Sequence, residues 1–252
     1  MVIFDVETEA LPLEQILQVS GDFDPPAAPG EFDPASVKYG NTKDQEKRAA
    51  ILADAQQRHA AAVASHSAKV EELRTAWQAD LLADAALSPV TGRVLCVGYY
   101  NPEKDKLSID DGGQGESESA ILGRFWATYL KVKNEGRSMV GLNIFDFDLP
   151  FLARRSWING IDVPETAIDQ SFRYWDRVFV DLRRRWLLGQ HSTSCKSNFE
   201  VIAKALGTPG KNGLSGADFA KLWREDREKA VEYLKGDLIQ PAQWCRRMGV
   251  VA

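Results

Sequence analysis

The most restrictive feature of this sequence is its opening, a short apolar run that carries two carboxylates. Residues 1–7 read Met-Val-Ile-Phe-Asp-Val-Glu, which predicts a β-strand with Asp5 and Glu7 on one face. Apolar residues also frame Asp148, at the start of a predicted helix, and Asp237, inside the last predicted helix. Burying several carboxylates together is costly unless cations neutralise them. The sequence therefore predicts a fold that gathers these acids around bound metal.

The order of the predicted elements indicates an α/β fold. After the opening strand come a β-hairpin, a helix, a buried strand, a second helix, a short strand and further helices, which predicts a mixed sheet flanked by helices. The expected ranges are 93–100 and 106–110 for the hairpin, 116–132 for the first helix, 139–143 for the buried strand, a helix from 148, a strand at 177–182, and helices at 198–206, 216–223 and 226–248.

An insertion interrupts this order after the first strand. Residues 20–40 are rich in Pro, Gly and Asp, which predicts an extended loop, and residues 42–86 are rich in Ala, Glu, Lys and Gln, which predicts one or two long amphipathic helices resembling an exposed hairpin. We expect residues 11–87 to be a loop plus helical insertion within one domain, 1–252. This insertion is either an arm that contacts DNA or a partner, or a brace packed on the core. The apolar spacing is too irregular for a sustained coiled coil.

Composition excludes several classes of protein. No apolar run approaches the roughly 18 residues that a membrane span needs, and no secretory leader precedes the first strand, so we expect a cytoplasmic protein. The three cysteines are odd in number and widely spaced, which fits neither a disulfide framework nor a zinc cluster. With three histidines, the chain offers poor support for a His-based triad or a His-rich metal site. Its chemistry must therefore be built mainly from carboxylates.

Ligand sets made only of oxygen suit Mg²⁺ or Mn²⁺. Two such ions about 3.5–4 Å apart can activate water and stabilise the leaving oxygen in phosphodiester cleavage. Tyr233 precedes Asp237 by four residues, so the two side chains share one helix face. A phenol in that position could orient a metal-bound water.

Taken together, three motifs resemble those of DEDD-type 3′–5′ exonucleases of the RNase H-like superfamily. Their order and element types also agree with that family, in the tyrosine subclass shared with exonuclease domains of family B DNA polymerases. The matching segments are Asp5-Val-Glu7, Asn143-Ile-Phe-Asp-Phe147-Asp148 followed by Leu-Pro-Phe-Leu, and Tyr233-Leu-Lys-Gly-Asp237. The resemblance covers most of 1–10 and 88–250. More narrowly, the segments that begin at Ser88 and Leu214 are similar to predicted exonucleases of phage and prophage origin.

The resemblance implies a role for each matching residue. Asp5, Glu7 and Asp237 would ligate one of two Mg²⁺ or Mn²⁺ ions, and Asp5 would bridge to the second, with Asp148 supporting it. Tyr233 would position the attacking water. The residues that match Asn143 and Phe147 in the family lie near the 3′ end of the substrate, so these two are expected to bind substrate.

Two further acids compete with this assignment. Asp146 lies two residues before Asp148 and would be the ligand if the register slipped, although the Phe-Asp-apolar-Pro-Phe frame favours Asp148. Asp181 ends a predicted strand and is expected to cap the helix that follows.

The net charge of −5 does not exclude nucleic acid, because a nuclease needs only local basic patches for phosphates. Arg154, Lys196 and Lys211 are the substrate-binding candidates, and each could equally lie on a solvated charged surface. The other basic candidates are Arg155, Arg183, Arg184, Arg185 and Lys204. The aromatic residues that could stack on bases, unless they belong to the core, are Trp157, Tyr174, Trp175 and Trp186.

The function implied by the resemblance is metal-dependent 3′–5′ exonuclease activity on DNA that releases nucleoside monophosphates. Single-stranded ends are the expected substrate, because a narrow acidic funnel admits one strand more readily than a duplex. In 252 residues there is no room for a polymerase as well, so a replication or recombination protein is a candidate partner. The alternatives are an exoribonuclease of the same superfamily and a non-catalytic module that binds nucleic acid or recruits a partner.

Overall fold

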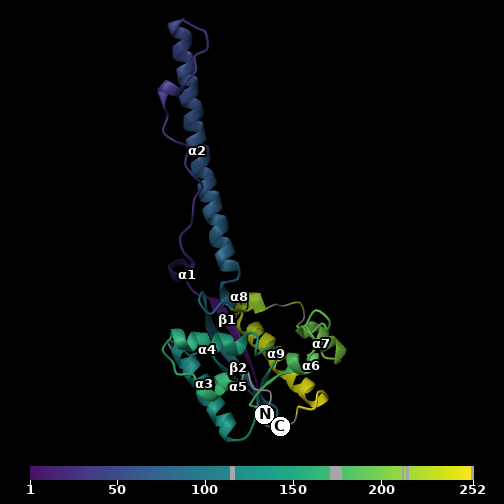
Figure 1. Ribbon diagram of the computed structural model, residues 1–252. Helices are drawn as coiled ribbons and strands as arrows, with labels where there is room; N and C mark the ends of the chain where they lie inside the picture. Colours follow the sequence, from purple (N-terminus) through teal and green to yellow (C-terminus); the bar gives the residue numbers. More distant parts are fainter. Residues whose placement is uncertain (114–116, 171–177, 212, 214–215, 251–252) are drawn as a thin grey trace. The chain divides into compact units, whose positions relative to one another are not determined.

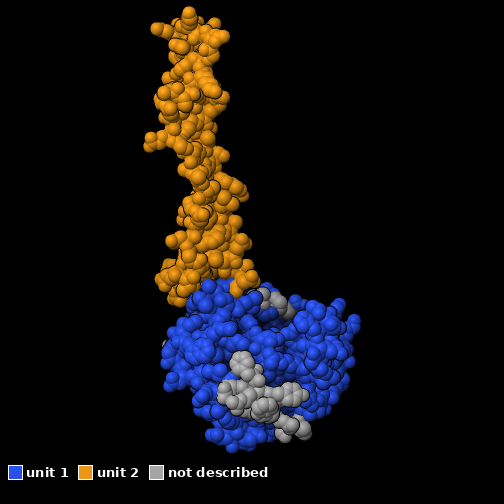
Figure 2. Space-filling model, in the orientation of Figure 1, with its two compact units in different colours: residues 1–12, 85–252 blue, residues 13–84 orange. Residues whose placement is uncertain are grey.

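The computed structural model describes residues 1–113, 117–170, 178–211, 213 and 216–250 (Figure 1). The chain divides into two compact units, which Figure 2 shows in blue and orange. Unit 1 comprises residues 1–12 and 85–252, and unit 2 comprises residues 13–84. The insertion expected at 11–87 therefore forms a compact unit of its own.

Unit 1 is built on a five-stranded mixed sheet with the order β3-β2-β1-β4-β5. The first strand, β1 (Val2–Ala10), lies at the centre, antiparallel to β2 (Gly92–Asn101) and parallel to β4 (Met139–Gly141). β3 (Lys106–Asp110) pairs antiparallel with β2, and β5 (Phe179–Asp181) pairs parallel with β4. The mixed sheet predicted from the sequence is therefore confirmed.

Helices cover both faces of this sheet (Figure 1). One face packs against α3 (Glu118–Asn134), α4 (Asp148–Ile158) and α5 (Glu165–Gln170). The other packs against α6 (Leu182–Leu187), α7 (Phe199–Ala205), α8 (Gly216–Glu225) and α9 (Arg227–Arg247). A short 3₁₀ helix, η2 (Ala85–Leu87), precedes β2.

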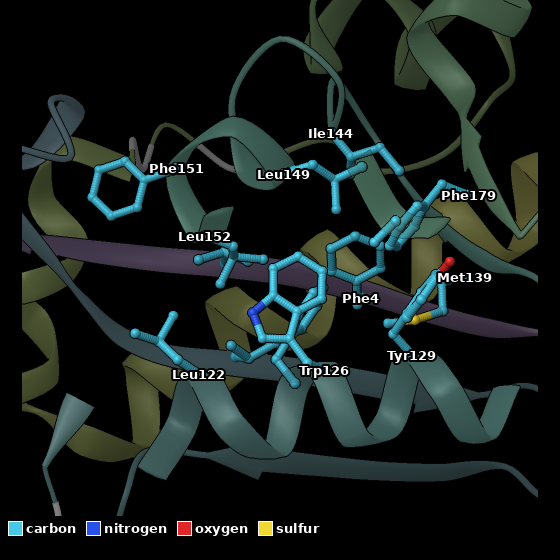
Figure 3. Close-up of a cluster of buried hydrophobic side chains, with 14 of the residues drawn as sticks. Phe4, Leu122, Trp126, Tyr129, Met139, Ile144, Leu149, Phe151, Leu152 and Phe179 are labelled. Carbon is cyan, nitrogen blue, oxygen red and sulfur yellow. The ribbon is translucent and has the colours of Figure 1, made fainter. Parts of the chain in front are cut away.

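Aromatic side chains fill the core on the α3 side (Figure 3). Phe4 lies with its ring centroid 5.4 Å from that of Phe125 and 6.1 Å from that of Phe179. Trp126 donates a buried hydrogen bond of 2.8 Å to the hydroxyl of Ser156, which satisfies its one polar atom. Because β1 alternates its side chains, the residues next to Phe4 point to the opposite face, toward α9.

A glycine on β2 lets α9 approach the sheet closely. Gly98 pairs with Asp5 in the register of β1 and β2, and a Cβ atom at Gly98 would lie 2.8 Å from Leu238 and 3.0 Å from Leu234. A larger residue would push α9 away from the strand. The glycine thus helps to bring the side chains of α9 next to those of β1.

Unit 2 is dominated by one long helix, α2 (Gln45–Ala83), preceded by α1 (Leu13–Ser20) and the 3₁₀ helix η1 (Pro34–Ser36). Of the one or two long helices expected over residues 42–86, the structure shows one and no hairpin, and α1 was not predicted. Residues 45–83 contain neither Gly nor Pro, so nothing in them breaks the helix. Asp44 caps α2 by accepting hydrogen bonds from the N–H groups of Glu46 and Lys47.

The extended segment of residues 21–44 packs along α2 in place of a second helix. Phe23 contacts Trp77 with 5.6 Å between ring centroids. Farther along, His66 Nε2 lies 3.0 Å from the carbonyl oxygen of Pro26, and His59 Nε2 lies 2.7 Å from that of Gly30. Two of the three histidines of the chain therefore tie this segment to the helix. Among the described helices, none has the length and apolar character required to cross a membrane.

Candidate active site

Three carboxylates from two elements converge on one face of the sheet. Asp5 and Glu7 come from β1 and Asp237 from α9, and one oxygen of each lies within 4.8 Å of the others. Glu7 and Asp237 are buried, and Asp5 is half-buried. The period-two spacing on the strand and the close approach of α9 produce this cluster.

Asp148 lies beside the cluster at the first residue of α4. Its side chain is buried, and Oδ1 accepts a hydrogen bond of 3.1 Å from the backbone N–H of Val6, the residue between Asp5 and Glu7. Its carboxylate also raises the pKa of Asp5. The structure therefore brings all four predicted acids together, with Asp148 outside the tight group of three.

The four acids are held in an environment that disfavours their charge. Burial is the main cause that raises the pKa of Asp5 and of Glu7 well above the ordinary range, and the neighbouring carboxylates add to it. Burial also raises the pKa of Asp148 to about 7 and the pKa of Asp237 above its usual range. Such a group of carboxylates becomes stable when a cation joins it.

Lys211 is the cation that contacts this group within the described residues. Its Nζ donates hydrogen bonds of 2.6 Å to Asp237 Oδ2 and 2.8 Å to the phenol oxygen of Tyr233. Burial lowers the pKa of Lys211, but the carboxylates of Asp237 and Asp5 outweigh this effect and raise it above the usual range. Burial, with the charge of Asp237, raises the pKa of Tyr233, so its phenol stays protonated at neutral pH.

The loop before α4 is shaped by a different acid, Asp181. Its buried carboxylate caps α6 through the N–H groups of Arg183 and Arg184, as the sequence predicted. It also accepts hydrogen bonds of 3.0 and 3.1 Å from the N–H groups of Asn143 and Phe145. Because Asn143 has a left-handed backbone, with φ of 64°, these bonds stabilise an otherwise strained turn.

Two candidate substrate-binding residues, Asn143 and Phe147, lie in this loop. Within the described part of the chain, the contacts of their side chains are to residues other than the four acids. The amide oxygen of Asn143 accepts a hydrogen bond of 2.6 Å from Arg183, and the ring of Phe147 packs against Phe151. Asp146, the rival of Asp148, pairs with Arg183 at 2.9 Å and with Arg184 at 3.1 Å. The structure therefore places Asp148, and not Asp146, beside β1.

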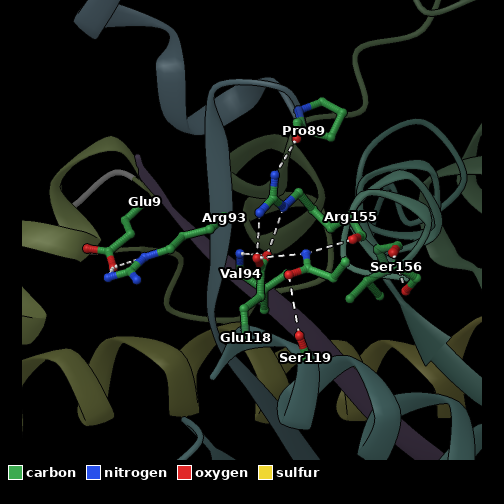
Figure 4. Close-up of polar contacts among 10 residues, drawn as sticks. Glu9, Pro89, Arg93, Val94, Glu118, Ser119, Arg155 and Ser156 are labelled. Atoms are coloured by element: carbon green, nitrogen blue, oxygen red, sulfur yellow. Dashed lines mark hydrogen bonds and ion pairs between the residues drawn. The ribbon is translucent and has the colours of Figure 1, made fainter. Parts of the chain in front are cut away.

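Arg155 does not form the basic patch that the sequence suggested. Its guanidinium is buried and pairs with Glu118, with hydrogen bonds of 2.9 and 2.5 Å, and donates a third of 3.0 Å to the carbonyl of Pro89 (Figure 4). Glu118 also accepts bonds from the backbone N–H of Val94 and from Asn159. This network joins α3, α4 and the start of β2.

The remaining basic and aromatic candidates lie elsewhere. Arg154 is exposed on α4 and lines an apolar hollow with Trp157, which is 58% exposed. Lys196 and Lys204 are exposed, and Trp186 donates a hydrogen bond of 3.0 Å to the carbonyl of Lys196. Outside the described residues lie Tyr174, Trp175 and Leu214. Of the three basic residues expected to bind substrate, the structure brings Lys211 to the acids.

Comparison with known proteins adds the family. The model of one protein family matches residues 91–248, more than half of the chain, and this family is described as a predicted 3′–5′ exonuclease related to the exonuclease domain of PolB. The chain belongs to this family. The relationship to PolB exonuclease domains expected from the three motifs is thereby confirmed.

Among solved structures, the chain is similar to the family B DNA polymerase from the hyperthermophilic archaeon Pyrobaculum calidifontis. The sequences are 15% identical, the TM-score is 0.48, and the match covers 66% of this chain and 23% of the polymerase. This exonuclease therefore spans less than a quarter of that polymerase. No curated protein matches the chain.

Exonuclease domains of this kind generally use divalent metal ions, and the donor set of this exonuclease fits such ions. Asp5, Glu7 and Asp237 supply oxygen atoms only, which hard cations such as Mg²⁺ and Mn²⁺ prefer. Among the described residues, four acids face Lys211 alone, so their ionised form has an excess of negative charge that a divalent cation would neutralise.

Sequence reasoning missed two residues that surround Lys211. Gln240 hydrogen-bonds both backbone groups of Gly210, and Glu200 accepts the backbone N–H of Lys211. Gln240 lies three residues after Asp237 and so belongs to the same side of α9. That spacing was the one signal in the sequence that could have pointed to it.

Proposed function

We propose that the protein is a metal-dependent exonuclease that removes nucleoside monophosphates from the 3′ end of DNA, with single-stranded ends preferred. The convergence of Asp5, Glu7 and Asp237 within 4.8 Å of one another carries this proposal. An oxygen-only cluster buried beside a protonated phenol and a lysine suits phosphodiester hydrolysis better than acid–base or nucleophilic chemistry by the protein alone.

In this proposal Asp5, Glu7 and Asp237 would hold one divalent ion, and Asp5 with Asp148 would hold a second. When bound, Mg²⁺ or Mn²⁺ supplies an activated nucleophile and stabilisation of the leaving oxygen. The hydrogen bond from Val6 keeps Asp148 oriented toward β1. The largely buried environment of the acids strengthens their attraction for a divalent cation relative to water.

Tyr233 and Lys211 act on the substrate side of the same cluster. The phenol of Tyr233 stays protonated and orients the attacking water by a hydrogen bond. The ammonium of Lys211 lies 2.6 Å from Asp237 and provides the positive charge that a non-bridging phosphate oxygen would contact. Its role as a substrate-binding residue is thus more specific than that of Arg154 or Lys196, which remain peripheral candidates, as do Asn143 and Phe147.

DNA is the proposed polymer, and RNA is the alternative within the same chemistry. The net charge of unit 1 is balanced, so affinity for the strand must come from contacts near the site and not from a general basic surface. A replication or recombination protein as partner and a cytoplasmic location both remain predictions.

The direct test uses matched single-stranded DNA, duplex DNA and RNA labelled at the 5′ or the 3′ end, incubated with Mg²⁺, Mn²⁺ or EDTA. We expect immediate loss of the 3′ label and a ladder from the 5′-labelled single-stranded DNA, abolished by EDTA. Faster degradation of RNA would replace the proposed polymer by the alternative.

A matched pair of variants locates the chemistry. Asp5→Asn removes one charge from the cluster and should abolish the ladder, whereas Asp146→Asn removes the charge that pairs with Arg183 and Arg184 and should leave it. Binding of DNA by the unmodified protein without cleavage in any metal would refute the enzymatic proposal and favour a recruitment module.

A further inference from the structure

We propose that Gln240 is a positioning residue, which fixes the loop that carries Lys211 and thereby sets the place of its ammonium beside Asp237 and Tyr233. This inference rests on the proposed function, because it gives Lys211 a role in the hydrolysis. The structural part, that Gln240 determines where Lys211 lies, can be measured without any turnover.

Both ends of the Gln240 amide bind one residue of the loop. Its Oε1 accepts the backbone N–H of Gly210 at 2.9 Å, and its Nε2 donates to the backbone carbonyl of Gly210, also at 2.9 Å. The glutamine is 6% exposed, and Gly210 is buried as well. Without this partner, the buried N–H and C=O groups of Gly210 would be unpaired, which costs free energy. The two hydrogen bonds therefore stabilise the position of the loop.

The other side of the loop is held by α7. Glu200 Oε1 accepts the backbone N–H of Lys211 at 2.6 Å. Gly210 has φ of +85°, and a Cβ atom there would lie 2.5 Å from Glu200 Oε2. The left-handed backbone therefore favours glycine at this position, and the carboxylate of Glu200 lies close beside it. Gln240 and Glu200 together fix the backbone on both sides of the bond between Gly210 and Lys211.

The same helix supplies the metal-site acid and the loop contacts. Beyond Asp237 and Gln240, Trp244 donates a hydrogen bond of 3.0 Å to the hydroxyl of Thr208, and Arg247 donates to the carbonyl of Leu206. One rigid element thus determines the distance between the carboxylate and the loop. A lysine side chain has four flexible bonds, so a fixed backbone is what limits the positions that its ammonium can take.

The first measurement compares Gln240→Met with Gln243→Met. The first substitution preserves much of the buried side-chain volume but removes both hydrogen bonds. The control residue, Gln243, is an exposed glutamine three residues later on α9, and it lines one hollow together with Gln240 and Lys211. In metal-free protein, acetylation of Lys211 by an N-hydroxysuccinimide ester, followed by peptide mass spectrometry, should become at least about threefold faster in Gln240→Met because the loop opens locally. It should stay unchanged in Gln243→Met.

The second measurement is a double-mutant cycle on single-stranded DNA. Gln240→Met should lower kcat by about tenfold to a hundredfold, with KM changed less than about twofold, because misplacement of a group at the site affects turnover. If Gln240 acts through Lys211, the double variant with Lys211→Ala should be no slower than Lys211→Ala alone. Gln240→Glu, which still accepts the N–H of Gly210, should fall between the wild type and Gln240→Met in labelling rate.

Different outcomes overturn different claims. Equal labelling of Lys211 in the wild type and both Gln240 variants would overturn the positioning role, as would kcat losses that multiply in the double variant. Absence of metal-dependent hydrolysis in the wild type would instead overturn the proposed function, and the labelling rates would then still decide whether Gln240 holds the loop.

Discussion

Two of the buried groups of charged side chains in unit 1 are built in opposite ways. At the junction of α3 and α4, Glu118 and Arg155 have side chains only 9% and 7% exposed, and they pair directly at 2.5 Å. Further hydrogen bonds join these two side chains to Val94, Asn159 and Pro89, so both charges are paired and hydrogen-bonded within the protein. Beside β1, four acids share one lysine, and burial raises the pKa of each acid.

The difference teaches how to distinguish a structural charge network from a functional one. A network in which every charge is paired and hydrogen-bonded within the protein has no charge left to bind a ligand. A group with excess charge of one sign destabilises the fold until something else binds, and it is therefore a site. Substitutions in the two groups should consequently have opposite effects on stability and activity.

The largest expected effect is on activity. Asp237→Asn should lower kcat on single-stranded DNA by about a thousandfold or more, because the amide is a poor ligand for a hard cation. The melting temperature of the metal-free variant should not fall, since the change removes a charge from an overcrowded group. Activity within tenfold of the wild type would show that the carboxylate cluster is not the catalytic centre.

Breaking the complete network should have the next largest effect, on stability. Arg155→Met leaves Glu118 buried without its partner and should lower the free energy of unfolding by about 3–5 kcal/mol. Urea denaturation monitored by tryptophan fluorescence measures this loss. The double variant Glu118→Met with Arg155→Met should recover most of it, because no unpaired charge remains; a persistent loss would mean that packing, not charge, explains the effect.

Divalent metal should sharpen the contrast between the two groups. At a concentration of about one hundred times its Kd, Mg²⁺ or Mn²⁺ should raise the free energy of unfolding by about 2.7 kcal/mol, measured as a shift of the melting temperature. Asp5→Asn should lose this shift. Arg155→Met should start from a lower melting temperature but keep the full shift, and an equal loss in both variants would contradict separate roles.

The smallest effect is a pH dependence. Burial raises the pKa of Asp148 to about 7, whereas a carboxyl in the unfolded chain titrates near about 3.9, so the folded protein binds this proton more tightly. Stability contributed by the protonated form is present at low pH and is lost as the pH rises through 7. Metal-free Asp148→Asn should therefore be more stable than wild type at pH 8, with the gain vanishing toward pH 4. A gain independent of pH would rule out this explanation.

Much of the site could be predicted because its acids follow local rules. The two-residue spacing of Asp5 and Glu7 on a strand, and the four-residue spacing of Tyr233 and Asp237 on a helix, determine which side chains share a face. Lys211 could be proposed only among several basic residues. Its contact with Tyr233 depends on how a glycine-containing loop packs against a helix, and no local spacing distinguishes it from Lys196.

The basic residues after the second motif could not be assigned for a related reason. A run of arginines in a sequence gives the charge but not the partner. Arg155 pairs with Glu118 across 37 residues and Arg183 with Asp146 across 37 residues, and both contacts require the finished sheet. In unit 2, composition predicted helix correctly, but the choice between one helix and two depended on whether residues 21–44 could pack along α2, which their lack of periodicity concealed.

The position of the cluster along the chain has a consequence for synthesis. Asp5 lies on the first strand and Asp237 on the last helix, so almost the whole chain is made between them. At about 5–20 residues per second, that interval lasts roughly 10 to 50 seconds. During this interval Asp5 and Glu7 have been synthesised, but Asp237 of α9 has not. An unfinished chain that lacks α9 therefore carries a carboxylate centre that is still unassembled.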